Sequence, residues 1–222
     1  MDDLATVVAQ LGGGPATLAG HSFAGLELTT FARRKPDAVD RLIYIEAAYD
    51  FSRMPDDATD PVSLAPKSED LASLAGGRRW FEQSFGFWHE AVGADANDVN
   101  VKPDGTMRLE SMRRDVASAL WKVMRAFTPD YRTITAPILA IYAVSEGHPL
   151  VHRDAAQEEI AAADAYWRTK WLPYQRDSMA QLVEAKGRTM VVVLRNTQHL
   201  CFLKSADESQ VVAAMRAAMT GP

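Results

Sequence analysis

The strongest constraint on the fold of this chain is the segment Gly20-His21-Ser22-Phe23-Ala24-Gly25, which follows the pattern G-x-S-x-G except that the small residue Ala24 replaces the last glycine of the pattern. In this pattern a serine lies on a strained turn between a strand and a helix, so that its Oγ projects clear of the backbone. Small residues flank the serine because the turn leaves no room for larger side chains. Chance would produce the strict G-x-S-x-G pattern in roughly one chain of this length in fifteen, since Gly and Ser are each about 7% of residues, and a form that also accepts alanine more often. The pattern alone therefore does not identify a nucleophile, and the segments before and after it have to be considered.

The segments around Ser22 have the order that such a turn requires. Residues 15–19 form a short apolar run after a glycine triplet, which predicts a buried strand. The residues behind Ser22, with Leu26 and Phe31 beside the small Ala24 and Ala32, fit a helix that stops before Lys35-Pro36. Residues 41–45 form a second continuous apolar run, as expected for a parallel strand covered on both faces. The pattern predicts one strand-helix-strand unit built around Ser22.

The rest of the chain alternates in the same way around one long interruption. Residues 137–143 and 190–194 predict two more buried strands. A helix is expected before them at 2–11, and a long helix between them that Pro173 breaks or kinks. A last helix closes the chain. The interruption is rich in turn residues at first and then helical, with predicted helices over about 109–127 and around the aromatic residues of 80–88.

Composition narrows the class of protein. The chain has 222 residues, 47% of them hydrophobic, and a net charge of −5 without a basic cluster, which argues against nucleic acid and against an anionic membrane surface. The sequence shows no apolar run long enough for a membrane span and no signal-peptide pattern. The single cysteine, Cys201, excludes an internal disulfide and gives little reason to expect a metal site. We expect a cytoplasmic protein that binds a small molecule and no metal. The sequence is compatible with a homo-oligomer.

A serine hydroxyl becomes a good nucleophile only beside a base, and a histidine base needs a carboxylate to fix its tautomer. His199 lies in the loop directly after the fourth predicted strand, and Glu146 directly follows the third. Glu46 directly follows the second strand and is a competing carboxylate. All three lie at carboxyl ends of predicted parallel strands, the edge where open α/β sheets place their sites.

With these residues the chain resembles the α/β-hydrolase family of serine hydrolases. The resemblance implies an α/β fold with a mostly parallel sheet flanked by helices, built from residues 1–49 and 133–222, with a helical cap insertion over 50–132. It implies Ser22 as nucleophile, His199 as general base, the Phe23 N–H as an oxyanion donor, and no cofactor. It places the acid on Glu146 ahead of Glu46, because the loop after the third strand is the usual position.

The chain departs from the family pattern at its start. In the family the nucleophile follows the fifth strand, whereas Ser22 follows the first strand predicted here. We therefore expect an N-terminally truncated form of the fold, in which the strand before Ser22 lies at an edge of the sheet.

The resemblance implies a serine hydrolase that cleaves a small ester-type or related acyl substrate through an acyl-enzyme. His21, Trp80, Phe85 and Trp88 are the candidate pocket residues. A carbon-carbon bond hydrolase or a perhydrolase would use the same three residues. A non-catalytic homologue that binds a ligand or a partner is the alternative from another class.

Overall fold

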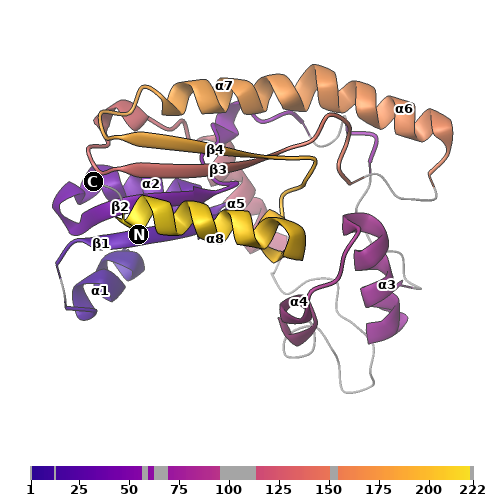
Figure 1. The fold of residues 1–222 in the computed structure, drawn as a ribbon, viewed down its shortest axis with the longest axis horizontal. Coiled ribbons are helices and arrows are strands. Elements are labelled where there is room, and N and C mark those ends of the chain that lie inside the picture. Colours follow the sequence, from indigo (N-terminus) through magenta and orange to yellow (C-terminus); the bar gives the residue numbers. More distant parts are fainter. Residues whose placement is uncertain are drawn as a thin grey trace. The chain divides into compact units, whose positions relative to one another are not determined.

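The computed structural model describes residues 2–12, 14–56, 60–62, 70–95, 114–150 and 155–220. Twelve labelled helices and strands occur in these residues (Figure 1). In chain order they are α1 (Asp2–Gln10), β1 (Ala16–His21), α2 (Ala24–Arg34), β2 (Val39–Ile45), α3 (Leu74–Phe85), α4 (Glu90–Asp95), α5 (Arg114–Arg125), β3 (Ile138–Val144), α6 (Gln157–Tyr166), α7 (Leu172–Leu182), β4 (Thr189–Arg195) and α8 (Ser205–Thr220).

The chain divides into two compact units. The first consists of Met1–Pro55, Val123–Val144 and Lys170–Pro222, and it holds all four strands. The second consists of Asp56–Lys122 and Ser145–Thr169. Each unit is described by itself, and the role of residues 50–132 as a cap stays a prediction.

The four strands form one parallel sheet in the order β1-β2-β3-β4 (Figure 1). Gly20 pairs with Tyr44, which pairs with Ala140, which pairs with Val191. The mostly parallel sheet predicted from the apolar runs is confirmed. Because all strands run the same way, the residues that follow them meet at one edge of the sheet.

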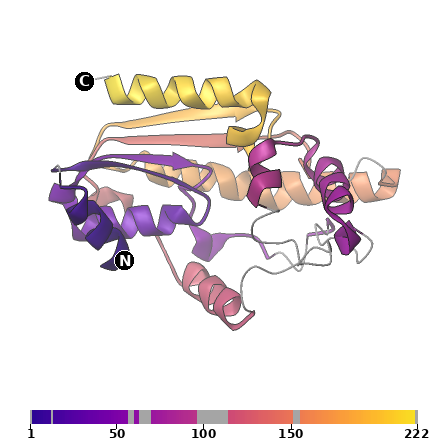
Figure 2. The ribbon, with the colours of Figure 1, turned by 90° about the horizontal axis from the view of Figure 1, so that it is seen from below.

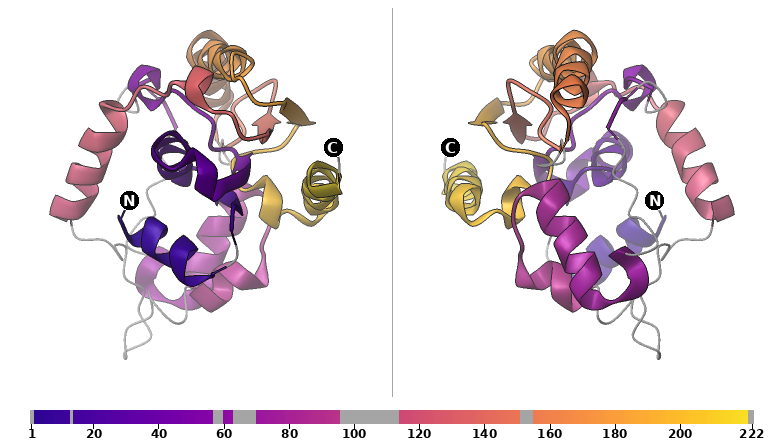
Figure 3. Two further views of the ribbon diagram at one scale, coloured as in Figure 1. Left: turned by 90° about the vertical axis from the view of Figure 1, so that its left-hand side faces the viewer. Right: turned by 90° about the vertical axis from the view of Figure 1, so that its right-hand side faces the viewer.

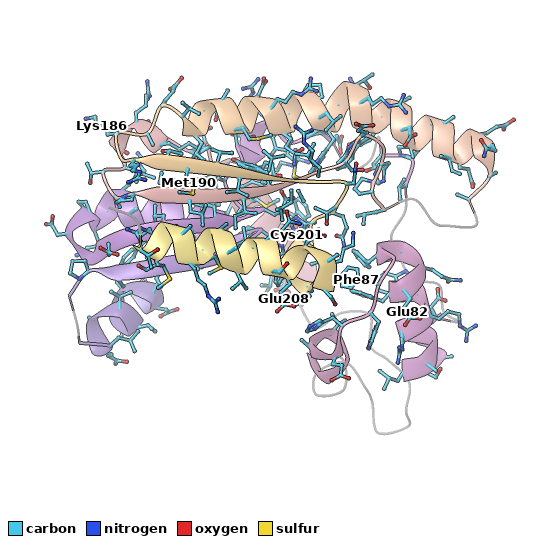
Figure 4. The ribbon with its side chains drawn as sticks, in the orientation of Figure 1. Glu82, Phe87, Lys186, Met190, Cys201 and Glu208 are labelled. Carbon is cyan, nitrogen blue, oxygen red and sulfur yellow. The ribbon has the colours of Figure 1, made fainter. Side chains whose placement is uncertain are left out.

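Helices cover the sheet on both faces, as Figure 2 and the end-on views of Figure 3 show for α8 on one side and α2 and α7 on the other. On the α8 side, Val211 packs with Ile43, Ile141 and Leu194. Cys201, labelled in Figure 4 beside the start of α8, is completely buried in this cluster. On the opposite side, residues of α2 and α7 enclose a larger cluster, whose members include Leu28, Phe31, Leu42, Tyr44, Tyr142, Tyr174 and Leu182.

The strand before Ser22 is less buried than its apolar sequence predicts. Thr17 and Ala19 of β1 are exposed, while Leu18 packs against the larger cluster. The cluster under α8 contains residues of β2, β3 and β4 but none of β1. Among the described residues β1 pairs with β2 alone, so it has the character of an edge strand with one open face.

Two helices differ from the prediction at particular residues. Gly86, with φ +78°, ends α3 in the left-handed conformation that suits glycine, so Phe87 and Trp88 lie beyond the helix. Pro173 does not break the long helix: the chain passes from α6 through a π-helical segment, Trp167–Trp171, into α7, and Pro173 sits in the first turn of α7. A proline is tolerated in the first turn of an α-helix, because the N–H that it lacks would have no acceptor within that helix. Residues 109–113 of the predicted helix 109–127 lie outside the described residues.

Candidate active site

Ser22 is the first residue after β1, and its backbone is strained. Its φ of +54° lies in the left-handed region that side chains with a Cβ rarely adopt. The turn is fixed by two hydrogen bonds: Ser22 N donates to the carbonyl of Ile45 at 3.2 Å, and Gly25 N donates to the carbonyl of Ser22 at 3.0 Å. The first bond joins the serine to the end of β2. The geometry is that of the strand-to-helix turn expected from G-x-S-x-G.

The two glycines of the segment around Ser22, Gly20 and Gly25, are required by close packing. A Cβ placed on Gly25 would lie 1.8 Å from the carbonyl oxygen of Ala47, and the obstacle is backbone. A Cβ placed on Gly20 would lie 2.8 Å from the Cβ of Ala24. Helix α2 can therefore approach the loop after β2 closely only because Gly25 has no side chain.

The Phe23 N–H is available to a ligand. Phe23 precedes the first residue of α2, and its N–H donates to no acceptor among the described residues. The start of an eleven-residue helix favours negative charge, because its N–H groups and dipole point outward there. This N–H can therefore stabilise a developing oxyanion next to Ser22.

Glu46 is the first residue after β2, as Ser22 is after β1, and its φ of +49° is likewise positive. Its side chain is only 4% exposed. One carboxylate oxygen, Oε2, lies 3.3 Å from Nδ1 of His199. The other, Oε1, accepts hydrogen bonds from the Tyr49 hydroxyl at 2.9 Å and from the Ala143 N–H. A buried carboxylate on a strained backbone marks a functional position, because both features cost free energy.

The Glu46 side chain also continues the sheet. The backbone pairing of β2 with β3 extends to Ile45 and Ile141, followed by the bond from Glu46 N to the carbonyl of Ile141 at 2.8 Å. The N–H of Ala143, two residues further along β3, donates to the Glu46 carboxylate at 2.6 Å and not to a backbone carbonyl of β2. The sheet itself thus orients the carboxylate toward the loop after β4.

His199 lies in that loop, and two hydrogen bonds hold the loop in place. Asn196, with φ +56°, donates its N–H to the carbonyl of Val144 at 2.7 Å. Thr197 donates its hydroxyl to the Asp207 carboxylate on α8. The imidazole of His199 remains 40% exposed. Since Nδ1 faces Glu46, Nε2 is the ring nitrogen left for a reacting group.

His21 links the serine turn to the histidine loop. Its Nε2 donates to the carbonyl oxygen of His199 at 3.0 Å, and the two imidazole rings lie 4.4 Å apart. Burial, and secondarily the neighbouring His199, lower the pKa of His21 to about 4. His21 is therefore neutral near pH 7 and adds no positive charge beside His199. Its described contacts are with the loop of His199, and its predicted role in the substrate pocket stays a prediction.

The structure thus brings Ser22, Glu46 and His199 to one edge of the sheet through neighbouring residues. Ser22 is bonded to Ile45, which precedes Glu46, and His21, which precedes Ser22, is bonded to His199. Within the described residues the Ser22 hydroxyl forms no hydrogen bond. A nucleophile and its base are often further apart in a free site than in a substrate complex.

A family model described as the alpha/beta hydrolase family matches residues 1–214. This chain belongs to the alpha/beta hydrolase family. The family membership supports a hydrolase activity in general terms. The comparison with curated proteins gives no match.

Solved structures of this family share the fold at low identity. An E-2-(acetamidomethylene)succinate hydrolase is 20% identical with a TM-score of 0.59, covering 97% of this chain and 70% of the other. A variant of a meta-cleavage product hydrolase is 14% identical with a TM-score of 0.57, covering 96% and 69%. A probable hydrolytic enzyme from Pseudomonas aeruginosa is 15% identical with a TM-score of 0.55, covering 99% and 68%. At these identities the likeness establishes the fold.

The other predicted site residues belong to the second unit. Glu146, expected as the acid, is exposed. Trp80, Phe85 and Trp88 lie in an aromatic group around Phe81, whose ring centroid is 4.5 Å from that of Phe85 and 5.7 Å from that of Trp88. Their role in binding substrate stays a prediction.

Three further observations bound the chemistry of the described residues. No group of three His, Cys, Asp or Glu side chains among them is placed to hold a metal ion. Burial raises the pKa of Cys201 to about 12, so this thiol is a core group and no competing nucleophile. None of the helices in the described part of the chain is long and apolar enough to span a membrane.

Sequence reasoning missed two residues at this site, Tyr49 and Gln175. Tyr49 contacts Glu46 from three positions further along the chain, and Gln175 contacts Tyr49 from α7. Tyr49 follows Glu46 closely enough for the sequence to suggest a local contact. Gln175 lies in the middle of a helical pattern and carries no signal that would have identified it.

Proposed function

We propose that this chain is a serine hydrolase that cleaves a small ester-type or related acyl substrate, with Ser22, His199 and Glu46 as its catalytic residues. The observation that carries the proposal is the contact of the buried Glu46 carboxylate with Nδ1 of His199, at the sheet edge where Ser22 occupies a strained turn. A serine nucleophile is activated by a histidine base, and the histidine is in turn oriented by a carboxylate.

Each residue has a defined role in the first half-reaction. Ser22 Oγ attacks the acyl carbonyl carbon while Nε2 of His199 takes the hydroxyl proton, and the carbonyl oxygen becomes an oxyanion that the Phe23 N–H stabilises. Collapse of this intermediate breaks the bond to the leaving group, which receives the proton from His199. Glu46 remains ionised throughout and stabilises the imidazolium of His199.

The second half-reaction repeats these steps with water. His199 removes a proton from a water molecule, whose oxygen attacks the acyl-serine, and the same proton then returns to Ser22 Oγ as the acid is released. An alcohol and a carboxylic acid are the two products, so atoms and charge balance without a metal or an organic cofactor.

The proposal assigns the acid to Glu46 and so departs from the expectation based on the third strand. Glu46 and Glu146 both follow strands directly, and the sequence ranks Glu146 first. The distance of 3.3 Å between Glu46 Oε2 and His199 Nδ1 favours Glu46. Two further hydrogen bonds, to Oε1, orient the same carboxylate. Glu146 is exposed, a surrounding in which a carboxylate interacts weakly with a partner.

Covalent labelling by a fluorophosphonate tests the proposal without knowledge of the substrate. The probe reacts with activated serines, so wild-type protein should gain one phosphonyl group and Ser22→Ala should gain none. Ser209→Ala, which changes an exposed serine on α8, is the matched control and should label as wild type does. Wild-type protein that is folded by circular dichroism but does not label would contradict the proposal and favour a non-catalytic binding protein.

A further inference from the structure

Tyr49 is a completely enclosed side chain directed at the Glu46 carboxylate. Its hydroxyl lies 2.9 Å from Oε1 of Glu46. Its ring is stacked on Tyr174, with centroids 5.6 Å apart, and meets the edge of Tyr142 at 5.3 Å. The ring therefore has little freedom to turn, and the position of its hydroxyl is fixed by packing.

Gln175 determines the direction of the hydrogen bond between Tyr49 and Glu46. Its amide nitrogen, Nε2, lies 2.9 Å from the carbonyl oxygen of Ala143 and 2.8 Å from the Tyr49 hydroxyl. The Ala143 oxygen accepts only, so the group facing it must be the NH₂. The two hydrogens of Nε2 go to Ala143 and to Tyr49, and the tyrosine oxygen is thereby an acceptor. The tyrosine hydrogen is left to donate to Glu46.

The oxygen atom of the Gln175 amide, in contrast to its nitrogen, is not used in a hydrogen bond among the described residues. Gln175 is 1% exposed, and its Oε1 has no hydrogen-bond partner among the described residues. A buried amide with an unpaired oxygen costs about 1–3 kcal/mol, which an apolar side chain of similar size would avoid. The amide is thus poorly suited to a packing role alone, whereas both of its donors are used next to Glu46.

We propose that Tyr49 and Gln175 are positioning residues that hold the Glu46 carboxylate aimed at His199, through a one-way chain of donors from Gln175 to Tyr49 to Glu46. This inference rests on the proposed function, because it assigns a role to residues that act through the acid of that site. Two donors on Oε1, Tyr49 O–H and Ala143 N–H, leave Oε2 as the oxygen for His199.

The titratable groups around Glu46 and His199 make the pH dependence of Ser22 labelling simple to interpret. The titratable side chains that interact electrostatically with Glu46 are three tyrosines and one cysteine: Tyr49, Tyr142, Tyr174 and Cys201. Burial raises the pKa of every one of them, and that of Cys201 reaches about 12. The pKa of His21, beside His199, is lowered to about 4. Between pH 5 and pH 9, these neighbouring groups therefore keep one protonation state.

The removal of the Tyr49 hydroxyl should therefore change the pH dependence of Ser22 reactivity. Without this donor the carboxylate charge is less stabilised, so the carboxylate attracts the imidazolium of His199 more strongly. In Tyr49→Phe the acidic limb of the fluorophosphonate labelling rate should move to higher pH by about one unit. The labelling rate at the plateau should fall about tenfold.

Two further variants separate positioning from packing. Tyr44→Phe also removes a buried tyrosine hydroxyl, one that contacts Thr29 at 3.0 Å, and serves as the matched control. Tyr44→Phe should lose stability like Tyr49→Phe but should keep the wild-type acidic limb. Gln175→Leu should shift the limb in the same direction by a smaller amount. The double variant Tyr49→Phe/Gln175→Leu should shift no further than Tyr49→Phe, because Gln175 acts through Tyr49.

The outcomes distinguish this inference from the proposed function. Folded wild-type protein that does not label at Ser22 would overturn the proposed function, and this inference with it. Ser22-dependent labelling with the same acidic limb in wild type and Tyr49→Phe would overturn this inference alone. Should Tyr49→Phe not fold, Gln175→Leu decides: a limb equal to that of wild type overturns the inference.

Discussion

Glu46 Oε2 lies 3.3 Å from Nδ1 of His199, although the two residues follow strands that are separated in the sheet by β3. The two side chains meet over the end of β3. The Ala143 N–H of β3 donates a hydrogen bond to the Glu46 carboxylate, and the loop after β4 places His199 next to it. The site is therefore a property of the sheet edge, with each of its parts supplied by a different strand end.

Stability should respond to the strain at Ser22. With φ at +54°, Ser22→Gly should be more stable than Ser22→Ala by about 1 kcal/mol, because glycine adopts this conformation without a Cβ clash. Both variants lack the hydroxyl, so neither should label with a fluorophosphonate. Chemical denaturation of the two proteins measures the difference. Equal stabilities would show that the turn is unstrained.

Gly25→Ala should be strongly destabilising. Its Cβ would lie 1.8 Å from the Ala47 carbonyl oxygen, and backbone cannot move aside cheaply. We expect a loss of about 3 kcal/mol or more in the free energy of unfolding, or no folded protein. Glu27→Ala, an exposed change on the same helix, should stay within about 0.5 kcal/mol of wild type. A stable, fully reactive Gly25→Ala protein would contradict the packing described for the turn.

His21 predicts a pH dependence of stability. Its pKa is about 4 in the folded protein and 6.5 when unperturbed, so between these values the unfolded chain binds the proton more tightly. The contribution of His21 to stability is complete above about pH 6.5 and decreases as the pH falls toward 4. In His21→Gln, which keeps an N–H donor for the His199 carbonyl, the melting temperature should decline less over this range. Parallel melting curves for the two proteins would exclude His21 as the cause.

Most of the fold was accessible from the sequence, for identifiable reasons. Continuous apolar runs located all four strands, because parallel strands covered on both faces need them. The exposure of Thr17 and Ala19 was not visible in a run of the same kind, since it depends on how far α8 extends across the sheet. Pro173 was expected to break or kink its helix, but it lies in the first turn of α7, directly after a π-helical segment that the sequence pattern does not indicate.

The candidate site was accessible in part. Strand ends pointed to Ser22, His199 and two carboxylates, but Glu46 and Glu146 have the same relation to a strand in sequence. The choice between them depends on Tyr49 and Ala143, which reach Glu46 in three dimensions. A contact between Tyr49 and Gln175, 126 positions apart, has no local signature.

The loop of His199 should depend on Asp207. Its carboxylate accepts a hydrogen bond from Thr197 and lies 3.6 Å from the Lys204 ammonium, and the side chain is largely buried. Asp207→Asn should lower the free energy of unfolding by about 1–3 kcal/mol and should slow the labelling of Ser22, because it loosens the loop. The exposed neighbour Glu208 provides the control: Glu208→Gln should change neither quantity. Asp207→Asn with wild-type reactivity would show that the loop does not need this anchor.

The most direct test compares fluorophosphonate labelling rates of Glu46→Gln and Glu146→Gln at pH 7. Glutamine keeps the size of the side chain and removes the charge that stabilises the His199 imidazolium, so the correct acid should lose at least about 100-fold in rate. The account predicts this loss for Glu46→Gln and a rate within about twofold of wild type for Glu146→Gln. A large loss in Glu146→Gln together with a near-normal rate in Glu46→Gln would contradict it.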